Sequence, residues 1–235
     1  MLSGRDTSLP TIFQVCLLRP DFSARDLIGF NNTGNVCVWP AEECMAMYCL
    51  ENSGKIFNDG KKVVELGGGM TCLAALILAK TVPHLDSVLL TDGNEASVDN
   101  LRSILCKNED LKNRVTADVL RWGKSPRPDL RAAFDVVLCA DCLFFDEFRL
   151  PLRDCIAALL KPSGVAVVMA PKRGKTHADF VSKARETFAV VTENARYSEK
   201  IWDRRQELMI DERFSEDIHY PVLLTLAQPR LISHL

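Results

Sequence analysis

From residue 63 onwards, short apolar runs alternate with stretches whose apolar residues recur at helical spacing. The apolar runs are rich in β-branched residues and predict strands at 63–66, 87–92, 114–120, 134–141 and 164–170. The stretches that follow them predict helices at 71–80, 95–108, 146–156 and 177–188. Regular alternation of strands and helices predicts an α/β fold built on a parallel sheet.

Both ends of the chain extend this pattern. Two further apolar runs, 188–192 and 220–227, predict strands six and seven, and this last pair could join the sheet in antiparallel orientation. Before residue 61 there is one clear helical stretch, 41–52, directly after Pro40. We therefore expect one domain over 61–235, preceded by a 1–60 segment that packs on its core.

The composition fits a compact domain without long disordered stretches, since 47% of the residues are hydrophobic and 26% are charged. A net charge of −2 provides no basic surface for nucleic acid, so we expect no nucleic-acid partner. The apolar run at 11–18 is too short and too polar for a signal or membrane helix, so no membrane association is expected either. We expect a monomer.

Nine cysteines are scattered through apolar segments of the chain. This odd set indicates reduced, buried thiols, as in a cytoplasmic protein that could also enter the nucleus. Cys139 and Cys142 form a C-x-x-C pair, but no second ligand pair follows at the spacing of a zinc site. The four histidines are also scattered, so we expect no metal.

The segment VVELGGGMTC places three glycines, Gly67, Gly68 and Gly69, directly after a predicted strand. Glycine lets the backbone adopt positive φ and approach a ligand that a side chain would exclude. A dinucleotide fingerprint needs a third glycine where Cys72 stands, and a phosphate loop needs a Gly-Lys-Ser/Thr sequence that is absent. The loop therefore favours a ligand without phosphate.

Carboxylates lie at the ends of the first two predicted strands, Glu65 beside the glycine loop and Asp92 in LLTDGN. A carboxylate at this edge of the sheet can accept hydrogen bonds from ribose hydroxyls. Together with the glycine loop they suit a nucleoside that carries no phosphate, and S-adenosylmethionine is such a ligand. Alternatively, Glu65 caps a helix or bonds backbone, and Asp92 is a turn residue.

Several longer stretches of the chain are similar to those of a known protein family, namely DLIGFNNTGNVCVWPAEE, VVELGGGMTCLAA, LLTDGN, FDVVLCADCLFFDE and HYPVLLTL. The chain resembles the seven-β-strand class I methyltransferases, and within them the lysine methyltransferase group that includes calmodulin-lysine N-methyltransferases. The resemblance covers roughly residues 26–226, whereas the first twenty residues match less clearly. It implies a Rossmann-like seven-stranded sheet, mostly parallel with an antiparallel last strand, and S-adenosylmethionine as cofactor.

The resemblance also implies roles for residues in the matching motifs. Gly67 to Gly69 would form the cofactor loop, and Asp92 would hold the ribose. Trp39 would line the methionine end of the cofactor, Trp122 would pack on the adenine, and Ala140 would offer a backbone contact. Either tryptophan could instead be an ordinary core residue.

The segment Asp141-Cys142-Leu143-Phe144 matches the D-x-x-[YF] motif of this lysine methyltransferase group. The resemblance makes Asp141 and Phe144 the candidate catalytic residues. We expect Asp141 to orient the substrate amine. Phe144 has no hydroxyl, so it can act only by shaping an apolar channel and by cation-π attraction, worth about 0.5–2 kcal/mol. Alternatively, Phe144 packs in the core or in a lid.

The resemblance implies calmodulin as the protein substrate. A small-molecule methyltransferase, and a methyltransferase fold kept for protein binding without catalysis, remain alternatives. Calmodulin is acidic, so the basic stretch after the fifth predicted strand, Pro171-Lys172-Arg173-Gly174-Lys175, is a candidate docking surface. Alternatively, the same stretch is a solvated loop.

Overall fold

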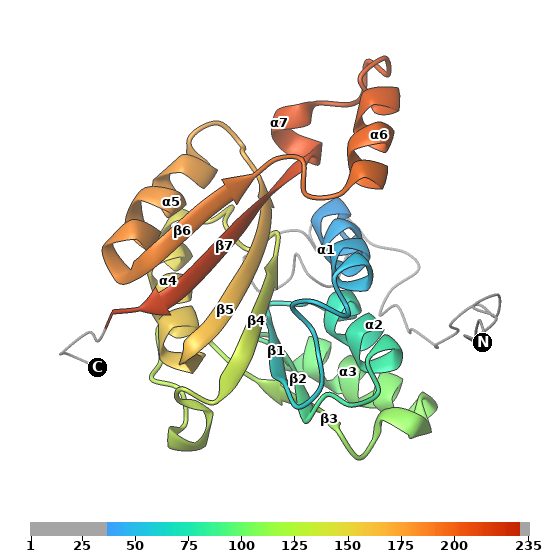
Figure 1. The fold of residues 1–235 in the computed structure, drawn as a ribbon, viewed down its shortest axis with the longest axis vertical. Helices are drawn as coiled ribbons and strands as arrows, with labels where there is room; N and C mark the ends of the chain where they lie inside the picture. Colours follow the sequence, from blue (N-terminus) through green and yellow to red (C-terminus); the bar gives the residue numbers. More distant parts are fainter. Residues whose placement is uncertain (1–36, 231–235) are drawn as a thin grey trace, which may run out of the picture.

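The computed structural model describes residues 37–230, and a seven-stranded sheet runs through them (Figure 1). The order of its strands is β3-β2-β1-β4-β5-β7-β6. Their bounds are β1 Lys62–Leu66, β2 Ser87–Asp92, β3 Val115–Val119, β4 Phe134–Ala140, β5 Leu160–Pro171, β6 Phe188–Asn194 and β7 Pro221–Pro229. All pairs are parallel except those of β7, which runs antiparallel to β5 and β6. The predicted fold class is confirmed.

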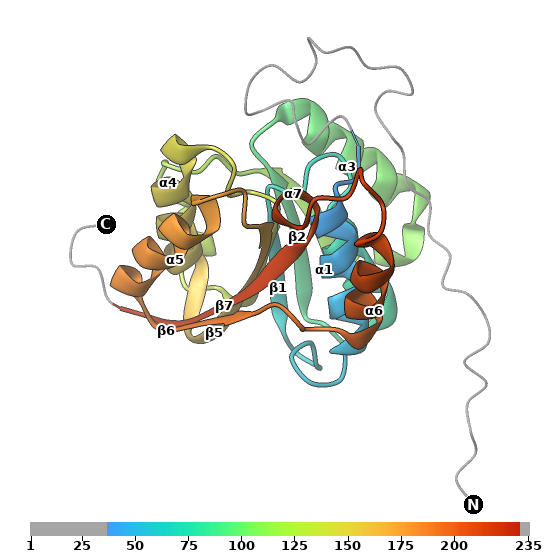
Figure 2. The same cartoon turned by 90° about the horizontal axis from the view of Figure 1, so that it is seen from above.

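Helices cover both faces of the sheet (Figure 2). One face carries three helices that share a hydrophobic core: α1 Pro40–Glu51, α2 Leu73–Thr81 and α3 Glu95–Lys107. The other face carries two helices, α4 Asp146–Leu159 and α5 Thr176–Thr187. Successive strand residues alternate between these cores, because side chains of a strand point to opposite faces. In β1, for example, Val63 joins the core with α1 and α2, and Val64 joins the core with α4 and α5.

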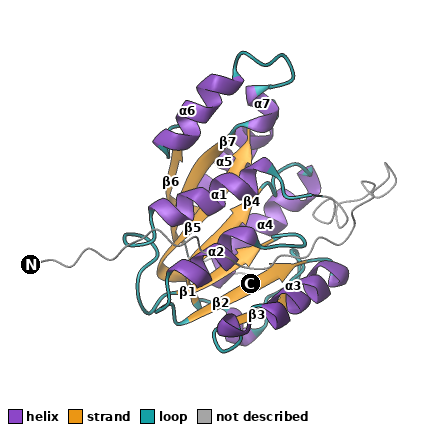
Figure 3. Cartoon of the chain, turned by 90° about the vertical axis from the view of Figure 1, so that its right-hand side faces the viewer, coloured by secondary structure: helices purple, strands orange, loops and turns teal. Residues whose placement is uncertain are grey.

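Two short helices, α6 Glu199–Leu208 and α7 Glu216–His219, lie between β6 and β7, at one end of the sheet beyond α1 (Figure 3). Arg205 of α6 connects this helix to its neighbours, since its guanidinium lies 5.3 Å from the Tyr220 ring centre and forms an ion pair with Glu216 of α7 at 2.7 Å. The insertion is thereby fixed next to the start of β7.

The segment expected to pack on the core, 1–60, lies largely outside the described residues. Its described part forms α1, which packs against α2. None of the helices within 37–230 is both long and apolar enough to cross a membrane.

Candidate active site

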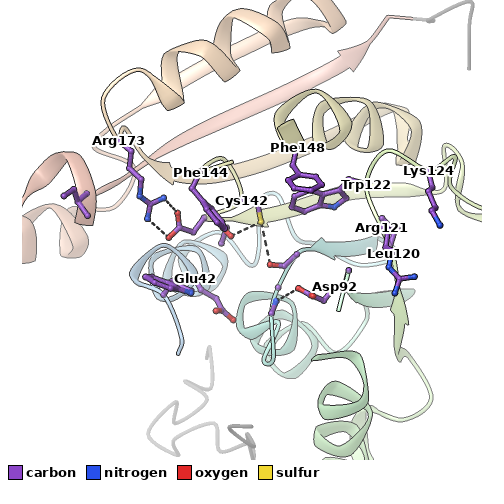
Figure 4. Close-up of a pocket in the computed structure, with 18 residues that line it drawn as sticks. Glu42, Asp92, Leu120, Arg121, Trp122, Lys124, Cys142, Phe144, Phe148 and Arg173 are labelled. Atoms are coloured by element: carbon purple, nitrogen blue, oxygen red, sulfur yellow. Dashed lines mark hydrogen bonds and ion pairs between the residues drawn. The ribbon is translucent and has the colours of Figure 1, made fainter. Parts of the chain in front are cut away.

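A cavity of about 530 Å³ opens where β1 has β2 on one side and β4 on the other (Figure 4). Ligands in open α/β sheets bind at this reversal of strand order, outside the carboxyl ends of the strands. The sequence-predicted residues that line the cavity are Trp39, Gly67, Gly68, Gly69, Asp92, Trp122, Ala140, Asp141 and Phe144. The structure thus gathers all but one of the predicted residues at one place.

The glycine loop is shaped by close contacts with its neighbours. Gly67 has a φ of +62°, and a Cβ built on it would lie 2.8 Å from both Trp122 and Cys142. A Cβ on Gly68 would lie 2.4 Å from the sulfur of Cys72. Glycine is therefore required at both positions, because a side chain would overlap with neighbouring atoms.

The loop's amide groups are bonded within the protein. The Gly68 N–H donates to the Thr91 carbonyl at 3.1 Å, and the Gly69 N–H donates to Asp92 Oδ2 at 2.9 Å. These amides are not left open for a phosphate, and the Asp92 carboxylate beside them would repel one. Burial raises the pKa of Asp92, while its backbone hydrogen bonds oppose that rise. The loop fits a phosphate-free nucleoside.

Glu65 is the one predicted cofactor residue that lies outside the cavity. It is fully buried, and its Oε2 accepts a hydrogen bond from the Ala75 N–H at 2.7 Å. The alternation of β1 directs Glu65 to the same face as Val63, onto the first turn of α2 and away from the cavity. Burial raises its pKa to about 8. The structure places it as a support for α2, in agreement with the helix-capping alternative.

Glu42 lines the cavity and was missed by the sequence prediction. Its Oε1 accepts hydrogen bonds from the Leu73 N–H at 2.9 Å and from the Thr71 hydroxyl. Burial raises its pKa to about 7. The sequence did contain a sign that Glu42 is buried, because at helical spacing it shares a face of α1 with the buried residues Met45 and Cys49. A carboxylate on the apolar face of a helix indicates a buried acidic group with hydrogen-bond partners inside the protein.

The D-x-x-F segment forms the other end of the site. Asp141 follows β4 with a φ of +54°, and its N–H donates to the Met169 carbonyl at 2.8 Å. Phe144 lines the cavity, and its ring centre lies 4.7 Å from that of Phe145. Phe148 also faces the cavity (Figure 4). An acidic group and aromatic rings thus lie close to the glycine loop.

The docking surface predicted after β5 needs a correction. Arg173 lines the cavity and forms an ion pair with Asp141, so its charge is not available at the surface. Of the basic residues in this stretch, Lys172 and Lys175 are exposed. The C-x-x-C pair is buried with both thiols free, and Cys142 lines the cavity, its thiol donating to the Ala140 carbonyl at 3.2 Å. Within 37–230 no cluster of side chains is suited to hold a metal.

Comparisons with known proteins agree with this geometry. A family model described as lysine methyltransferase matches residues 26–187. The chain belongs to the lysine methyltransferase family. It is 30% identical to a calmodulin-lysine N-methyltransferase of Arabidopsis thaliana over 88% of its own length and 69% of that protein. It is 26% identical to a protein N-lysine methyltransferase of Danio rerio, over 65% and 68% of the two chains.

Solved structures share the fold at low identity. A TehB-like S-adenosylmethionine-dependent methyltransferase from Corynebacterium glutamicum matches with a TM-score of 0.53 and 15% identity, over 87% of this chain and 93% of that chain. The 16S rRNA methyltransferase RsmC of T. thermophilus, in complex with AdoMet and guanosine, matches with a TM-score of 0.55 and 19% identity, over 82% and 44%. Lysine methyltransferases with this class I fold use S-adenosylmethionine as cofactor. The glycine loop fits that cofactor, because its bonded amides leave no site for a phosphate group.

Proposed function

We propose that this lysine methyltransferase acts on calmodulin and transfers a methyl group to one of its lysine side chains. The observation that carries the substrate is the 30% identity to the Arabidopsis calmodulin-lysine N-methyltransferase, which extends over 88% of the chain. The cavity supports this proposal because it has a nucleoside end and an acceptor end. Asp92 and Gly67 to Gly69 line the first, while Asp141 and Phe144 line the second.

Bound S-adenosylmethionine supplies an electrophilic methyl group on a sulfonium centre. A lysine amine attacks only as the neutral base, although free lysine has a pKa near 10.4. The aromatic rings of Phe144 and Phe148 exclude water from the acceptor end and thereby disfavour the ammonium form. Asp141 orients the amine, and solvent takes the proton. Alignment of the amine in the cavity provides much of the acceleration.

The direct test is incubation of the purified protein with labelled S-adenosylmethionine and calmodulin, followed by mass spectrometry. We expect label on a calmodulin lysine. Calmodulin whose lysines have been chemically acetylated beforehand serves as the control and should stay unlabelled, because an amide nitrogen has no lone pair available for attack.

Parallel incubations with a panel of small amines and acids distinguish the alternatives. A labelled small molecule with unlabelled calmodulin would make the protein a small-molecule methyltransferase. Cofactor binding without any labelled product would make it a binding protein. Either result contradicts the proposed substrate.

A further inference from the structure

Arg173 reaches into the acceptor end of the cavity from the turn after β5 (Figure 4). Its guanidinium donates through both terminal nitrogens to the Asp141 carboxylate, with Nη2 at 2.9 Å from Oδ2. The side chain of Asp141 is 9% exposed and that of Arg173 is 26% exposed. A bidentate pair with so little solvent is held more firmly than an ion pair on the surface.

The backbone around this pair is held in an uncommon conformation. Arg173 has a φ of +41° and Gly174 a φ of +64°, so the turn is left-handed at two successive residues. A non-glycine residue in this region costs about 1–2 kcal/mol. Asp217 of α7 clamps the turn, because its carbonyl accepts from the Arg173 N–H and its Oδ2 from the Gly174 N–H, both at 2.8 Å. The insertion between β6 and β7 thereby fixes where Arg173 points.

An unpaired carboxylate at this place would oppose methyl transfer. A negative charge next to an amine favours the ammonium form and raises the pKa of that amine. Asp141 without a partner would hold the substrate lysine in the form that cannot attack. Arg173 balances the negative charge while the carboxylate keeps lone pairs for a hydrogen bond from the amine.

We infer that Arg173 is a positioning residue that neutralises Asp141, so that Asp141 orients the substrate amine without trapping it as ammonium. This inference rests on the proposed lysine methylation. It assigns a chemical role to the left-handed turn and to its clamp by α7. Arg173 acts through Asp141 and need not touch the substrate.

Other charged or titratable groups border the same space, and among the described residues they are engaged elsewhere or neutral. Glu42 from α1 accepts from Thr71 and Leu73, and its pKa of about 7 is common to the wild type and the variants compared below. Asp92 from β2 accepts from Gly69 and Asn94. Burial raises the pKa of the Cys37 thiol, and the carboxylates of Glu42 and Asp141 raise it further, which keeps the thiol neutral. The charged groups left at the rim are exposed, namely Lys124 and Arg121, which pairs with Glu95.

The test is the pH dependence of kcat/KM for calmodulin, measured from about pH 6 to about pH 10 for the wild type, Arg173→Gln and Arg173→Lys. In Arg173→Gln we expect the apparent pKa of the rising limb to increase by about one unit, which lowers the rate about tenfold near neutral pH and restores it at high pH. Arg173→Lys keeps the charge and should recover most of the wild-type profile. Lys172→Gln, a charge loss at the exposed neighbour, should leave the pKa of the profile unchanged.

A second measurement does not depend on calmodulin being the substrate. Calorimetry with n-butylammonium, which mimics the lysine side chain, should show about tenfold tighter binding to Arg173→Gln than to the wild type at neutral pH, because Asp141 is then unpaired. A uniform loss of activity at every pH, or an unchanged affinity for n-butylammonium, would overturn the inference. An unlabelled calmodulin with tighter n-butylammonium binding would refute the substrate and retain the role of Arg173.

Discussion

Glu42 and Glu65 bring their carboxylates to the first turn of the same helix, α2. Glu42 Oε1 accepts from the Leu73 N–H at 2.9 Å, and Glu65 Oε2 accepts from the Ala75 N–H at 2.7 Å. The positive end of the helix dipole favours negative charge there, but burial opposes it and the two charges repel each other. Both pKa values are raised as a result, with burial as the largest cause. The charge on these two carboxylates beside the cavity therefore changes with pH near neutrality.

Glu65→Gln should reduce the dependence of stability on pH. Unfolded Glu65 titrates at its ordinary pKa of 4.5, whereas the folded protein keeps the proton up to about 8. The folded state thus binds more protons in this window, so the stability contributed by Glu65 is complete below 4.5 and is lost as pH rises to about 8. Urea unfolding across this range should show a shallower decline for the variant than for the wild type.

Glu43→Gln is the matched control for this change. Glu43 lies on the same helix as Glu42 but is exposed, so its removal should leave the slope of stability against pH unchanged. Equal slopes for the wild type and Glu65→Gln would show that Glu65 is ionised in the folded protein, and would contradict the assignment.

Much of the fold follows from the sequence because its strongest signals are local. Buried strands such as β4 and β5 contain uninterrupted apolar runs, 136–140 and 164–170, and α3 has a clear amphipathic period. The ends of elements are less certain: β5 begins at Leu160, four residues before the apolar run at 164, because Leu160 pairs with Phe134. That pairing depends on a partner strand and leaves no local pattern.

The same distinction between local signals and distant contacts separates the site residues that could be predicted from those that could not. The glycine loop and Asp92 are visible in the sequence because residues at the ends of neighbouring parallel strands must meet at one edge of the sheet. The direction of Glu65 depends on which face of β1 it occupies. The place of Arg173 depends on a left-handed turn clamped by Asp217, far along the chain, so the sequence shows only a basic loop.

Gly67→Ala should impair the cofactor loop. The new methyl group would lie 2.8 Å from both Trp122 and Cys142, so we expect a loss of about 1–3 kcal/mol in stability from overpacking, in addition to the cost of positive φ. Cofactor affinity, measured by calorimetry, should fall about tenfold. Gly60→Ala is the control, since Gly60 also has positive φ but its new methyl group would meet no neighbouring atom of the described residues within 4 Å. Equal losses in both variants would show that steric contact at Gly67 does not matter.

Asp92→Asn should weaken binding of S-adenosylmethionine about 10- to 100-fold, since hydrogen bonds to charged groups contribute about 1.5–3 kcal/mol. Asp92 accepts from the Gly69 and Asn94 amides, and the new amide group would face one of these donors. The glycine loop would lose the hydrogen bond from the Gly69 N–H to Asp92, and the ribose of the cofactor would lose a charged acceptor. Calorimetric titration measures the change.

Asp99→Asn provides the comparison for that titration. Asp99 is exposed and pairs with Arg102 at 2.8 Å, so its loss should leave cofactor affinity unchanged. If Asp92→Asn also kept full affinity, Asp92 would be a turn residue and would not hold the ribose.

Phe144→Leu separates cation-π attraction from simple packing at the acceptor end of the cavity. Leucine keeps an apolar side chain but removes the ring that faces the cavity, so kcat/KM for calmodulin should fall about 2- to 30-fold, the equivalent of about 0.5–2 kcal/mol. Phe144→Tyr keeps the ring and should retain most of the activity. Steady-state kinetics measure both variants. Full activity in Phe144→Leu would reduce Phe144 to a packing residue beside Phe145.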